Sequence, residues 1–361
     1  MINKFVSFFL NLLPTYKAVV FESIPNRSDS VINVYNYLKE LGYDKKYKFV
    51  WYGELKGIKK KYAKFKGKYL ISSNDILYTY STRQKSVYIM HGATAKDISQ
   101  YYCFNHLNVR QMDYCICQSK DLEEMCRRTM NMTKEGMVSI GLPRNDDFFK
   151  SSNISLKDVF GEYKKYIFWY PTAQPFSSEV INQNSNYVQF FNDPIKLKLI
   201  NEFCKSKDIL LCIKAHHAVK HFDNEDETFS NVVFFNNSLL EKLDVRNYTF
   251  LAKADALITD YSSVFYDYLL VKKPICFVWN DIELYKKDNG LSEEFLTDYY
   301  RCGSVCYKVE DLLNFLANIS ENKEPNKKDR EEITERIYGK NPKPCTPEVC
   351  DFIINYFGLK L

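Results

Sequence analysis

The chain has 361 residues, which is long for one core and matches two domains of ordinary size. Apolar residues make up 45% of it and charged residues 26%, so the composition is that of a globular protein and excludes disordered or fibrous classes. The net charge is only +5 and no RNA- or DNA-binding motif is present, so nucleic acid is not expected as a partner.

The cysteines and the first residues bear on location. Eleven cysteines are scattered without zinc-type CxxC pairs or a secreted disulfide framework, and no secretory cleavage site follows the start, so a cytoplasmic protein is expected. The first apolar run has about seven residues, whereas a membrane span needs about 20. Its stripe either lies on the inner face of the cytoplasmic membrane, as a peripheral contact, or packs on the protein's own body. The stripe consists of Phe5, Phe8, Phe9, Leu12 and Leu13.

Residues 56–68 carry seven lysines and no acid. A run of this kind is either a solvated face or a surface attracted to anions. The anionic partner would be phospholipid headgroups, at about 1 kcal/mol per lysine near a membrane, or a polyanionic acceptor.

The first part of the chain alternates apolar, β-branched runs with helical patterns. Strands are expected near 16–23, 47–53, 86–92, 113–119 and 137–143, with helices at 30–42 and 121–130. Strands that are apolar throughout and alternate with helices predict a doubly wound parallel sheet. This α/β lobe is expected to cover residues 1–155.

After a polar stretch the pattern starts again. Strands are expected near 166–172, 209–217, 232–236, 256–263 and 274–281, with helical patterns at 193–207, 239–254 and 264–273. A second α/β lobe over 156–335 is therefore expected, and 336–361 is interpreted as a closing helical segment.

Ligands of open α/β sheets bind beyond the carboxyl ends of the strands, so the polar residues after each apolar run are the candidates for a site. These are His91 and Gly92, Pro143 to Asp146, Pro171 and Thr172, Lys214 and His216, and Asp260 to Ser263. His106 and His221 lie outside such positions and are expected on the surface or in loops.

The segment "TDYSS", residues 259–263, joins a predicted strand to a predicted helix. Unpaired N–H groups and the positive dipole end at a helix start favour a phosphate there. Capping of the helix by Asp260 or Ser262 is the structural alternative, and both roles are compatible. No Walker or GxGxxG pattern is present, so a nucleoside triphosphatase or nicotinamide enzyme is not expected.

"ALITDYSSVFYDYLLVKKPICFVWND", residues 256–281, resembles the signature of the CDP-glycerol glycerophosphotransferase family, whose members make teichoic acid and capsule polymers. Four further segments resemble family motifs in the family's order: "MHGATAKD" its WHGTxxK motif, "GLPRND" its GYPRND motif, "WYPTAQ" its YAPTWR motif and "IKAHH" its K-x-H-P motif.

The resemblance implies a GT-B-like architecture of two Rossmann-like lobes with a cleft between them, the first for the acceptor and the second for the nucleotide donor. It implies His91 as general base, and His216 with Ser262 and Ser263 as holders of the donor's pyrophosphate. The remaining donor-site candidates are Pro171, Thr172, Lys214, Thr259 and Asp260. Further substrate-binding candidates are Gly92, Lys96, Arg144, Asn145, Asp146 and His217, of which Arg144 to Asp146 either orient the donor or lock their own turn.

Three positions depart from the motifs. Ala93 stands at a Thr position, His217 at a Pro position and Gln174 at an Arg position. With Gln174 in place of arginine, one positive charge near the donor's phosphates is missing. The motifs therefore indicate the type of reaction better than they indicate the identity of the donor.

The reaction expected from the resemblance is transfer of a polyol phosphate from a CDP-polyol to an acceptor hydroxyl, with CMP released. The acceptor would be lipid-linked or polymeric. Such a transfer needs positioning, charge stabilisation at phosphate oxygens and a base, and histidine can serve as base near neutral pH. It requires no cofactor; Asp260 and Asp281 are too far apart in sequence to indicate a metal pair, and magnesium stays open. A GT-B glycosyltransferase using a CMP- or UDP-sugar and a catalytically inactive envelope scaffold are the alternatives.

Overall fold

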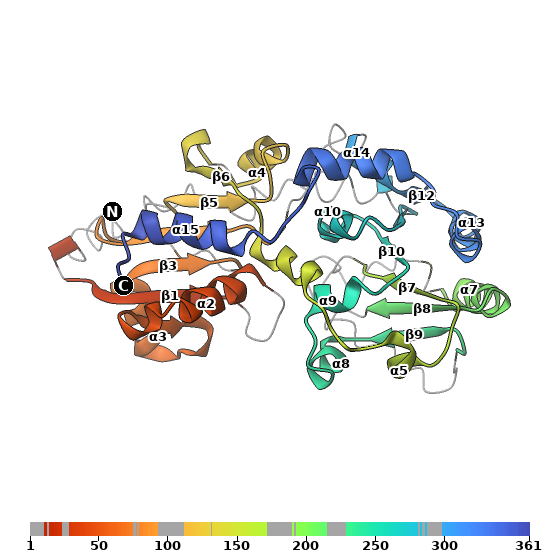
Figure 1. Ribbon diagram of the computed structural model, residues 1–361, viewed down its shortest axis with the longest axis horizontal. Coiled ribbons are helices and arrows are strands. Elements are labelled where there is room, and N and C mark those ends of the chain that lie inside the picture. Colours follow the sequence, from red (N-terminus) through yellow and green to blue (C-terminus); the bar gives the residue numbers. More distant parts are fainter. Residues whose placement is uncertain are drawn as a thin grey trace. The chain divides into compact units, whose positions relative to one another are not determined.

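The structure is a computed structural model that describes residues 11–12, 14–23, 29–74, 77, 79–92, 112–130, 132–171, 190, 193–214, 229–280, 282–283, 286 and 298–361. The chain forms two units (Figure 1). Unit 1 comprises Met1–Lys150 and Asn341–Leu361, and unit 2 comprises Ser151–Lys340. The division at Lys150 lies close to the boundary expected at 155, and the C-terminal segment returns to unit 1.

A parallel sheet forms the centre of unit 1. In the described part its strands lie in the order β2 (Lys48–Trp51), β1 (Tyr16–Glu22), β3 (Gly67–Ser72), β4 (Lys85–Ile89), β5 (Tyr114–Cys117) and β6 (Met137–Ser139). All neighbouring strands pair in parallel. The chain runs from β1 outward to β2 and then crosses to β3, so the order of the strands reverses between β1 and β3.

Helices cover both faces of this sheet. Helices α2 (Ser30–Glu40) and α15 (Thr346–Phe357) contact each other on one face, where the Phe357 ring stacks on Tyr69 at 4.9 Å (Figure 1). Helix α3 (Gly57–Lys66) buries Ala63 on the other face, against Val20 and Leu70. Unit 1 also contains helix α4 (Glu123–Met130) and, among its described 3-10 helices, η5 (Pro143–Phe149). Burial on both faces explains why the strands are apolar throughout.

Unit 2 repeats the architecture. In the described residues its parallel strands lie in the order β12 (Ser304–Cys306), β11 (Ile275–Val278), β10 (Ala256–Thr259), β7 (Lys165–Trp169), β8 (Ile209–Lys214) and β9 (Val232–Phe235). The chain runs from β7 through β8 to β9 and then returns to β10. Its switch point therefore lies between β7 and β10.

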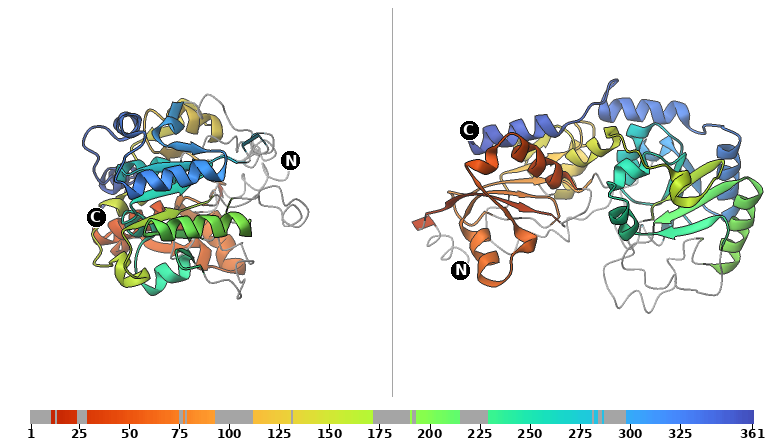
Figure 2. Two further views of the ribbon diagram at one scale, coloured as in Figure 1. Left: turned by 90° about the vertical axis from the view of Figure 1, so that its right-hand side faces the viewer. Right: turned by 60° about the horizontal axis from the view of Figure 1, so that its bottom comes forward.

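The two faces of this sheet have different helical covers. Helices α7 (Pro194–Ser206) and α13 (Val309–Ser320) pack together over one face (Figure 2). Two short helices cover the other face. Phe250 of α9 (Asn247–Leu251) packs on Phe168 of β7, and Phe265 of α10 (Val264–Tyr268) packs on Phe277 of β11. The remaining described α-helices of unit 2 are α5 (Leu156–Phe160), α8 (Asn237–Lys242) and α14 (Lys327–Tyr338).

The expected class, two doubly wound Rossmann-like lobes, is confirmed, and particular elements differ from the expectation. The helical pattern expected over 239–254 is divided between α8 and α9, since Asp244 adopts a left-handed φ of 49° between them. Strand β3 and helix α3 were not recognised within the lysine-rich run and its sequel, and β12, α13 and α14 were also missed. The N-terminal stripe lies outside the described residues except for Leu12, which is 62% exposed.

Candidate functional site

The carboxyl ends of three neighbouring strands in unit 2 carry the predicted donor-binding residues. Strand β7 is followed by Pro171, β8 ends at Lys214, and β10 ends at Thr259 with Asp260 next. Because β10, β7 and β8 are adjacent and parallel, these residues share one edge of the sheet, at the switch point where α/β proteins bind ligands. The fold thus brings together residues that are separated by up to 89 positions of sequence, from Pro171 to Asp260.

Tyr170, which the sequence did not single out, organises this edge. Its carbonyl accepts a hydrogen bond from Thr259 Oγ1 at 2.7 Å, and its own hydroxyl donates to Asn247 Oδ1 at 3.0 Å. Lys214 Nζ lies 5.1 Å from the centre of its ring, a cation–π distance. Burial raises the pKa of Tyr170 well above its ordinary value, so the phenol stays protonated. The only available signal was its place as the last residue before Pro171.

The segment 259–263 forms turns that precede a short helix. Asp260 is 2% exposed, and its Oδ1 accepts from Ser262 N at 3.1 Å. Ser262 Oγ accepts from Val264 N at 3.4 Å, and the capping position itself belongs to Ser263, whose side chain makes no capping bond. Both serines are half-buried. The structure thus shows the polar segment holding its own turn, and the half-buried hydroxyl of Ser263 is not used for that purpose.

Asp260 also acts electrostatically on its surroundings. Burial, followed by the negative charge of Asp260, raises the pKa of Tyr300. Tyr261 stacks on Trp279 with ring centres 6.3 Å apart, and Trp279 in turn lies 5.1 Å from Tyr300. The carboxyl ends of β10 and β11 are therefore flanked by packed aromatic rings, which hold the backbone of the 259–263 segment in place.

In unit 1, His91 lies directly beyond β4 and its side chain is exposed. Its carbonyl oxygen accepts a hydrogen bond from Arg144 Nη1 at 2.6 Å. The next residue, Gly92, is buried and has a φ of 124°, which side chains with a Cβ rarely adopt. The backbone around the predicted base is thus fixed by a buried arginine and by a turn that needs glycine.

Two neighbours of Arg144 have structural partners. The Asp146 carboxylate accepts from Cys345 N and Thr346 N, both at 2.8 Å, and so holds the start of α15. Asn145 is 4% exposed, and its backbone N–H donates to the Leu142 carbonyl at 2.9 Å. The Asn145 bond lies within the turn, whereas Asp146 ties the segment to the start of α15, and a role in orienting the donor stays a prediction.

Several predicted residues lie outside the described residues. They are Lys96, Thr172, His216 and His217, together with Ala93, Gln174 and Asp281. In the sequence, Ala93 and Lys96 come after β4, Thr172 and Gln174 after β7, His216 and His217 after β8, and Asp281 after β11.

A second polar cluster, which the sequence analysis did not single out, lies at the ends of β1 and β3, at the switch point of unit 1. Glu22 Oε2 accepts from Asn74 N at 3.1 Å, and Ser23 Oγ donates to Asp29 Oδ2 at 2.5 Å. Asp29 also caps α2 by accepting from Val31 N at 3.3 Å. Glu22, Ser23 and Asp29 are buried, so these contacts fix the strand ends of this unit.

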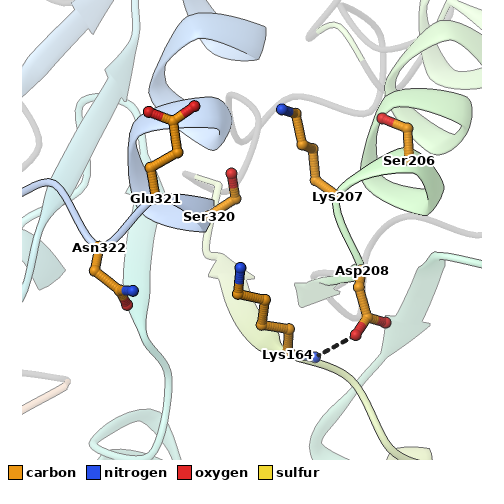
Figure 3. A pocket seen from close by; sticks show the side chains of 7 residues that line it. All are labelled: Lys164, Ser206, Lys207, Asp208, Ser320, Glu321 and Asn322. Carbon is orange, nitrogen blue, oxygen red and sulfur yellow. Dashed lines mark hydrogen bonds between the residues drawn. The ribbon is translucent and has the colours of Figure 1, made fainter.

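A hollow of about 590 Å³ occurs elsewhere in unit 2 (Figure 3). Lys164 and Asp208, which line it, come directly before β7 and β8, and the Lys164 backbone N–H donates to Asp208 Oδ2 at 3.2 Å. It therefore lies at the amino ends of the strands, at the opposite edge from the predicted donor site. Lysines and acids line it in equal number, which gives no preference for an anion.

Within the described part of the chain, no three His, Cys, Asp or Glu side chains are grouped closely enough to hold a metal ion. The same residues contain no helix with the length and apolar character needed to cross a bilayer.

Comparison with known proteins matches residues 4–355 to the family model described as CDP-glycerol:poly(glycerophosphate) glycerophosphotransferase. A teichoic acid glycerol-phosphate primase of Bacillus subtilis (strain 168) is 27% identical over 206 residues, covering 56% of this chain and 48% of the primase. A teichoic acid ribitol-phosphate primase of Bacillus spizizenii is 24% identical over 252 residues, covering 68% of this chain and 59% of that protein. The chain thus spans about half the length of these relatives.

Among solved structures, one of the wall teichoic acid polymerase TagF matches with a TM-score of 0.72 and 20% identity. The match covers 99% of this chain and 94% of the TagF chain. At this identity the likeness establishes a shared fold.

Proposed function

Because the chain belongs to the CDP-glycerol:poly(glycerophosphate) glycerophosphotransferase family, we propose that it transfers glycerol phosphate or ribitol phosphate from a CDP-polyol to an acceptor hydroxyl. The polymer made would be a teichoic acid or a capsular polymer, and the acceptor would be lipid-linked or polymeric. The observation that carries the proposal is the gathering of Pro171, Lys214 and Asp260 to Ser263 at the switch point of unit 2.

The proposed chemistry is a single displacement at phosphorus. The acceptor oxygen attacks the β-phosphorus of the donor, the bond from this phosphorus to the oxygen bridging to the α-phosphate breaks, and CMP leaves with that bonding pair. His91 takes the proton of the acceptor hydroxyl, and the product is a phosphodiester. An exposed imidazole beyond β4 is suited to this task because its ordinary pKa is close to neutrality.

The donor's pyrophosphate is assigned to unit 2. Lys214 supplies a positive charge, the half-buried Ser262 and Ser263 supply hydroxyls and backbone N–H groups, and His216 follows β8 in the sequence. Fixed donors of this kind stabilise charge that develops on phosphate oxygens without reorganising during the reaction. Thr259 serves indirectly in this assignment, since it ties the end of β10 to Tyr170.

In unit 1, Arg144 is assigned a positioning role. Its hydrogen bond to the His91 carbonyl fixes the backbone from which the imidazole projects. Magnesium is not needed by these steps, which use only side chains and backbone groups of the chain.

The test is CMP release from a panel of CDP-glycerol, CDP-ribitol, CMP-sialic acid and UDP-sugars, measured with purified protein and a lipid-linked or phosphorylated acceptor. We expect turnover of a CDP-polyol and its loss, by at least about 100-fold, in His91→Asn, because general-base catalysis contributes roughly 100- to 10,000-fold. His221→Asn, outside every strand-end motif, is the matched control. Turnover of sugar nucleotides alone would replace the proposal by a glycosyltransferase, and no turnover of any donor would favour an inactive scaffold.

A further inference from the structure

The carboxyl ends of β1 and β3 in unit 1 carry buried polar side chains beside the start of α2. Glu22, Ser23 and Asp29 are buried, and Ser73, which directly follows β3, is 0% exposed. The next residue, Asn74, is exposed, so the group reaches the surface there. It lies at the switch point of the sheet, where open α/β proteins bind ligands. We define the α2 corner as the group Glu22, Ser23, Asp29, Ser30, Ser73 and Asn74.

The alternation of side chains along β3 places Ser73 on the face of the sheet that α2 covers. Phe21 on β1 pairs with Ile71 on β3, and the Phe21 ring contacts a tyrosine ring of α2 at 5.1 Å (Figure 1). Because side chains alternate between the two faces of a strand, Ser23 and Ser73 continue this face. The Ser23 hydroxyl does lie there, since it donates to the carboxylate of Asp29 directly before α2. The Ser73 side chain therefore belongs beside the start of α2.

The Ser73 hydroxyl differs from its neighbours in its hydrogen bonding. Ser72 Oγ accepts from Leu77 N at 3.2 Å, and Glu22 Oε2 accepts from Asn74 N. Within the described structure, Ser73 Oγ is buried without a hydrogen-bond partner. A buried hydroxyl without a partner is unfavourable, and most buried polar groups of folded proteins are hydrogen-bonded. A hydroxyl group of a ligand at the α2 corner would supply the missing partner.

Arg144 connects the α2 corner to the predicted base. Its backbone N–H donates to Ser30 Oγ at 3.3 Å, and its Nη1 donates to the His91 carbonyl at 2.6 Å. In addition, β3 lies between β1 and β4, and His91 directly follows β4. The α2 corner and His91 thus belong to one edge of the sheet, and a single arginine contacts both.

The charge of the α2 corner indicates the class of ligand that fits it. Glu22 and Asp29 contribute carboxylates, and the defined group includes no lysine or arginine. A carboxylate repels a phosphate, whereas it accepts hydrogen bonds from hydroxyl groups. The donor edge of unit 2 differs, since Lys214 supplies a positive charge there. The α2 corner therefore fits a neutral group that is rich in hydroxyls.

We propose that the α2 corner binds the hydroxyl-bearing end of the acceptor, a terminal polyol or sugar unit, and so brings the attacking hydroxyl to His91. The Glu22 carboxylate accepts a hydrogen bond from one hydroxyl of this unit, and the Ser73 hydroxyl bonds to a neighbouring one. A site built to bond a hydroxyl discriminates strongly against a ligand that lacks it. The inference rests on the proposed transfer, because it names the place of the acceptor in that reaction.

The test is calorimetric binding to the full chain, which needs no donor. The probes are short oligomers of glycerol phosphate and of ribitol phosphate with a free polyol end, the same oligomers ending in a phosphomonoester, and a neutral disaccharide. We expect binding of a hydroxyl-ended probe, and binding at least about tenfold weaker when a phosphomonoester ends the same oligomer. Ser73→Ala should weaken binding of the hydroxyl-ended probe about 3- to 10-fold, the effect of one neutral hydrogen bond.

The matched control is Ser72→Ala, which removes the adjacent hydroxyl. We expect Ser72→Ala to lower the unfolding temperature, because Leu77 N loses its acceptor, and to leave probe binding unchanged. Ser73→Ala should show the opposite pattern, with unfolding unchanged and binding weakened. Glu22→Gln keeps an acceptor for Asn74 N and removes the charge, so it should reduce the preference for the hydroxyl end over the phosphate end.

Transfer kinetics separate this site from the donor site. Ser73→Ala should raise the KM for the acceptor and leave the KM for the CDP-polyol unchanged. Failure of the unchanged chain to bind any probe, unchanged binding by Ser73→Ala, or an equal loss of binding in Ser72→Ala would overturn the proposal. Absence of CMP release from every donor would overturn the proposed reaction instead, and probe binding would still decide whether the α2 corner binds hydroxyl groups.

Discussion

Thr259 shows at the scale of one residue how a candidate ligand contact can serve the fold. Its side chain is fully buried, and its Oγ1 donates to the Tyr170 carbonyl at 2.7 Å. This bond joins the ends of β10 and β7, the strands on either side of the switch point. The hydroxyl proton is therefore engaged within the protein, although the residue stands in the segment that resembles the family signature.

We predict that Thr259→Val lowers the free energy of unfolding by about 1–3 kcal/mol, because the nearly isosteric change leaves the buried carbonyl without its donor. Thr259→Ser keeps the donor and should lose only about 1 kcal/mol, for the missing methyl group. Denaturant unfolding measures both. A raised KM for the CDP-polyol with unchanged unfolding in Thr259→Val would instead indicate direct contact with the donor.

Arg144 was a candidate from the sequence because of its motif, but the sequence did not indicate which residue it contacts. The hydrogen bond from Arg144 to the His91 carbonyl joins residues separated by 53 positions. No periodicity or spacing contains that information, since the contact depends on how the segment after β6 returns toward the end of β4.

At the scale of elements, helix α15 depends on a residue from the far end of unit 1. The Asp146 carboxylate accepts hydrogen bonds from the backbone N–H groups of Cys345 and Thr346 at the start of α15. The dipole of the helix also favours a carboxylate at this end. Phe352 and Tyr356 of this helix contact the Tyr114 ring on β5. The closing helix expected from the sequence exists, and its attachment to unit 1 follows from these contacts.

We expect Asp146→Ala to lower the free energy of unfolding by about 1.5–3 kcal/mol, the range for hydrogen bonds to a charged group. Asp146→Asn keeps one acceptor oxygen and should lose less. Hydrogen exchange of the first turn of α15 should quicken in both variants, in the same order. Unaltered exchange there would show that Asp146 does not hold the helix.

Helix α14 is joined to its surroundings by ion pairs. Asp298 accepts from Arg336 Nη1 at 2.9 Å and Nη2 at 2.8 Å. The hydrogen bonds to Arg336 chiefly, with the charges of Arg336 and Arg301, lower the pKa of Asp298, against the opposing effect of burial. A carboxyl group whose pKa is lowered by folding stabilises the fold above its unfolded pKa and loses that contribution as the pH falls through the folded value.

The contribution of Asp298 should thus be complete above about pH 4, near the unfolded pKa of Asp, and should disappear in more acidic solution. Denaturant unfolding between pH 7 and pH 2.5 should show a less steep acid loss for Asp298→Asn than for the unchanged chain. Asp351→Asn, an exposed carboxylate on α15, is the control. Parallel curves for all three proteins would contradict the assignment.

The elements that sequence analysis missed have identifiable causes. Residues 56–68 contain seven lysines, and of the residues of α3 only Ala63 is buried against the sheet. The sequence therefore gives no clear amphipathic pattern there, and the segment was interpreted only as a run of charge. Strand β3 begins within that run, and its burial becomes evident only from its place between β1 and β4. The prediction of helix over 239–254 was correct in the type of structure, but it did not include the break at Asp244, whose left-handed backbone follows the end of α8.

At the scale of the whole molecule, unit 2 is built from one continuous segment of the chain, whereas unit 1 is built from two. The sheet of unit 2 and the helices α7 and α13 that cover one face all belong to Ser151–Lys340. Unit 1 needs Asn341–Leu361 in addition, because α15 covers Tyr69 and Tyr114 of its sheet.

We predict that a fragment of residues 151–340 unfolds cooperatively by itself, whereas a fragment of residues 1–150 does not, since it would expose the aromatic face that α15 covers. Calorimetry of both fragments measures this. Addition of a peptide of residues 341–361 should restore a transition to the first fragment. A cooperative transition of 1–150 without the peptide would show that α15 is dispensable for the fold of unit 1.

The sequence by itself determined the class of fold and offered the candidate residues, because buried parallel strands leave continuous apolar runs and family motifs are local strings. Only the tertiary structure decided which strands are neighbours, that Tyr170 accepts the bond from Thr259, that Arg144 holds the His91 backbone and that Asp146 holds α15. These contacts join residues that are distant along the chain. They form only because of the order of the strands in each sheet and because α15 packs back on unit 1, and local sequence patterns encode neither.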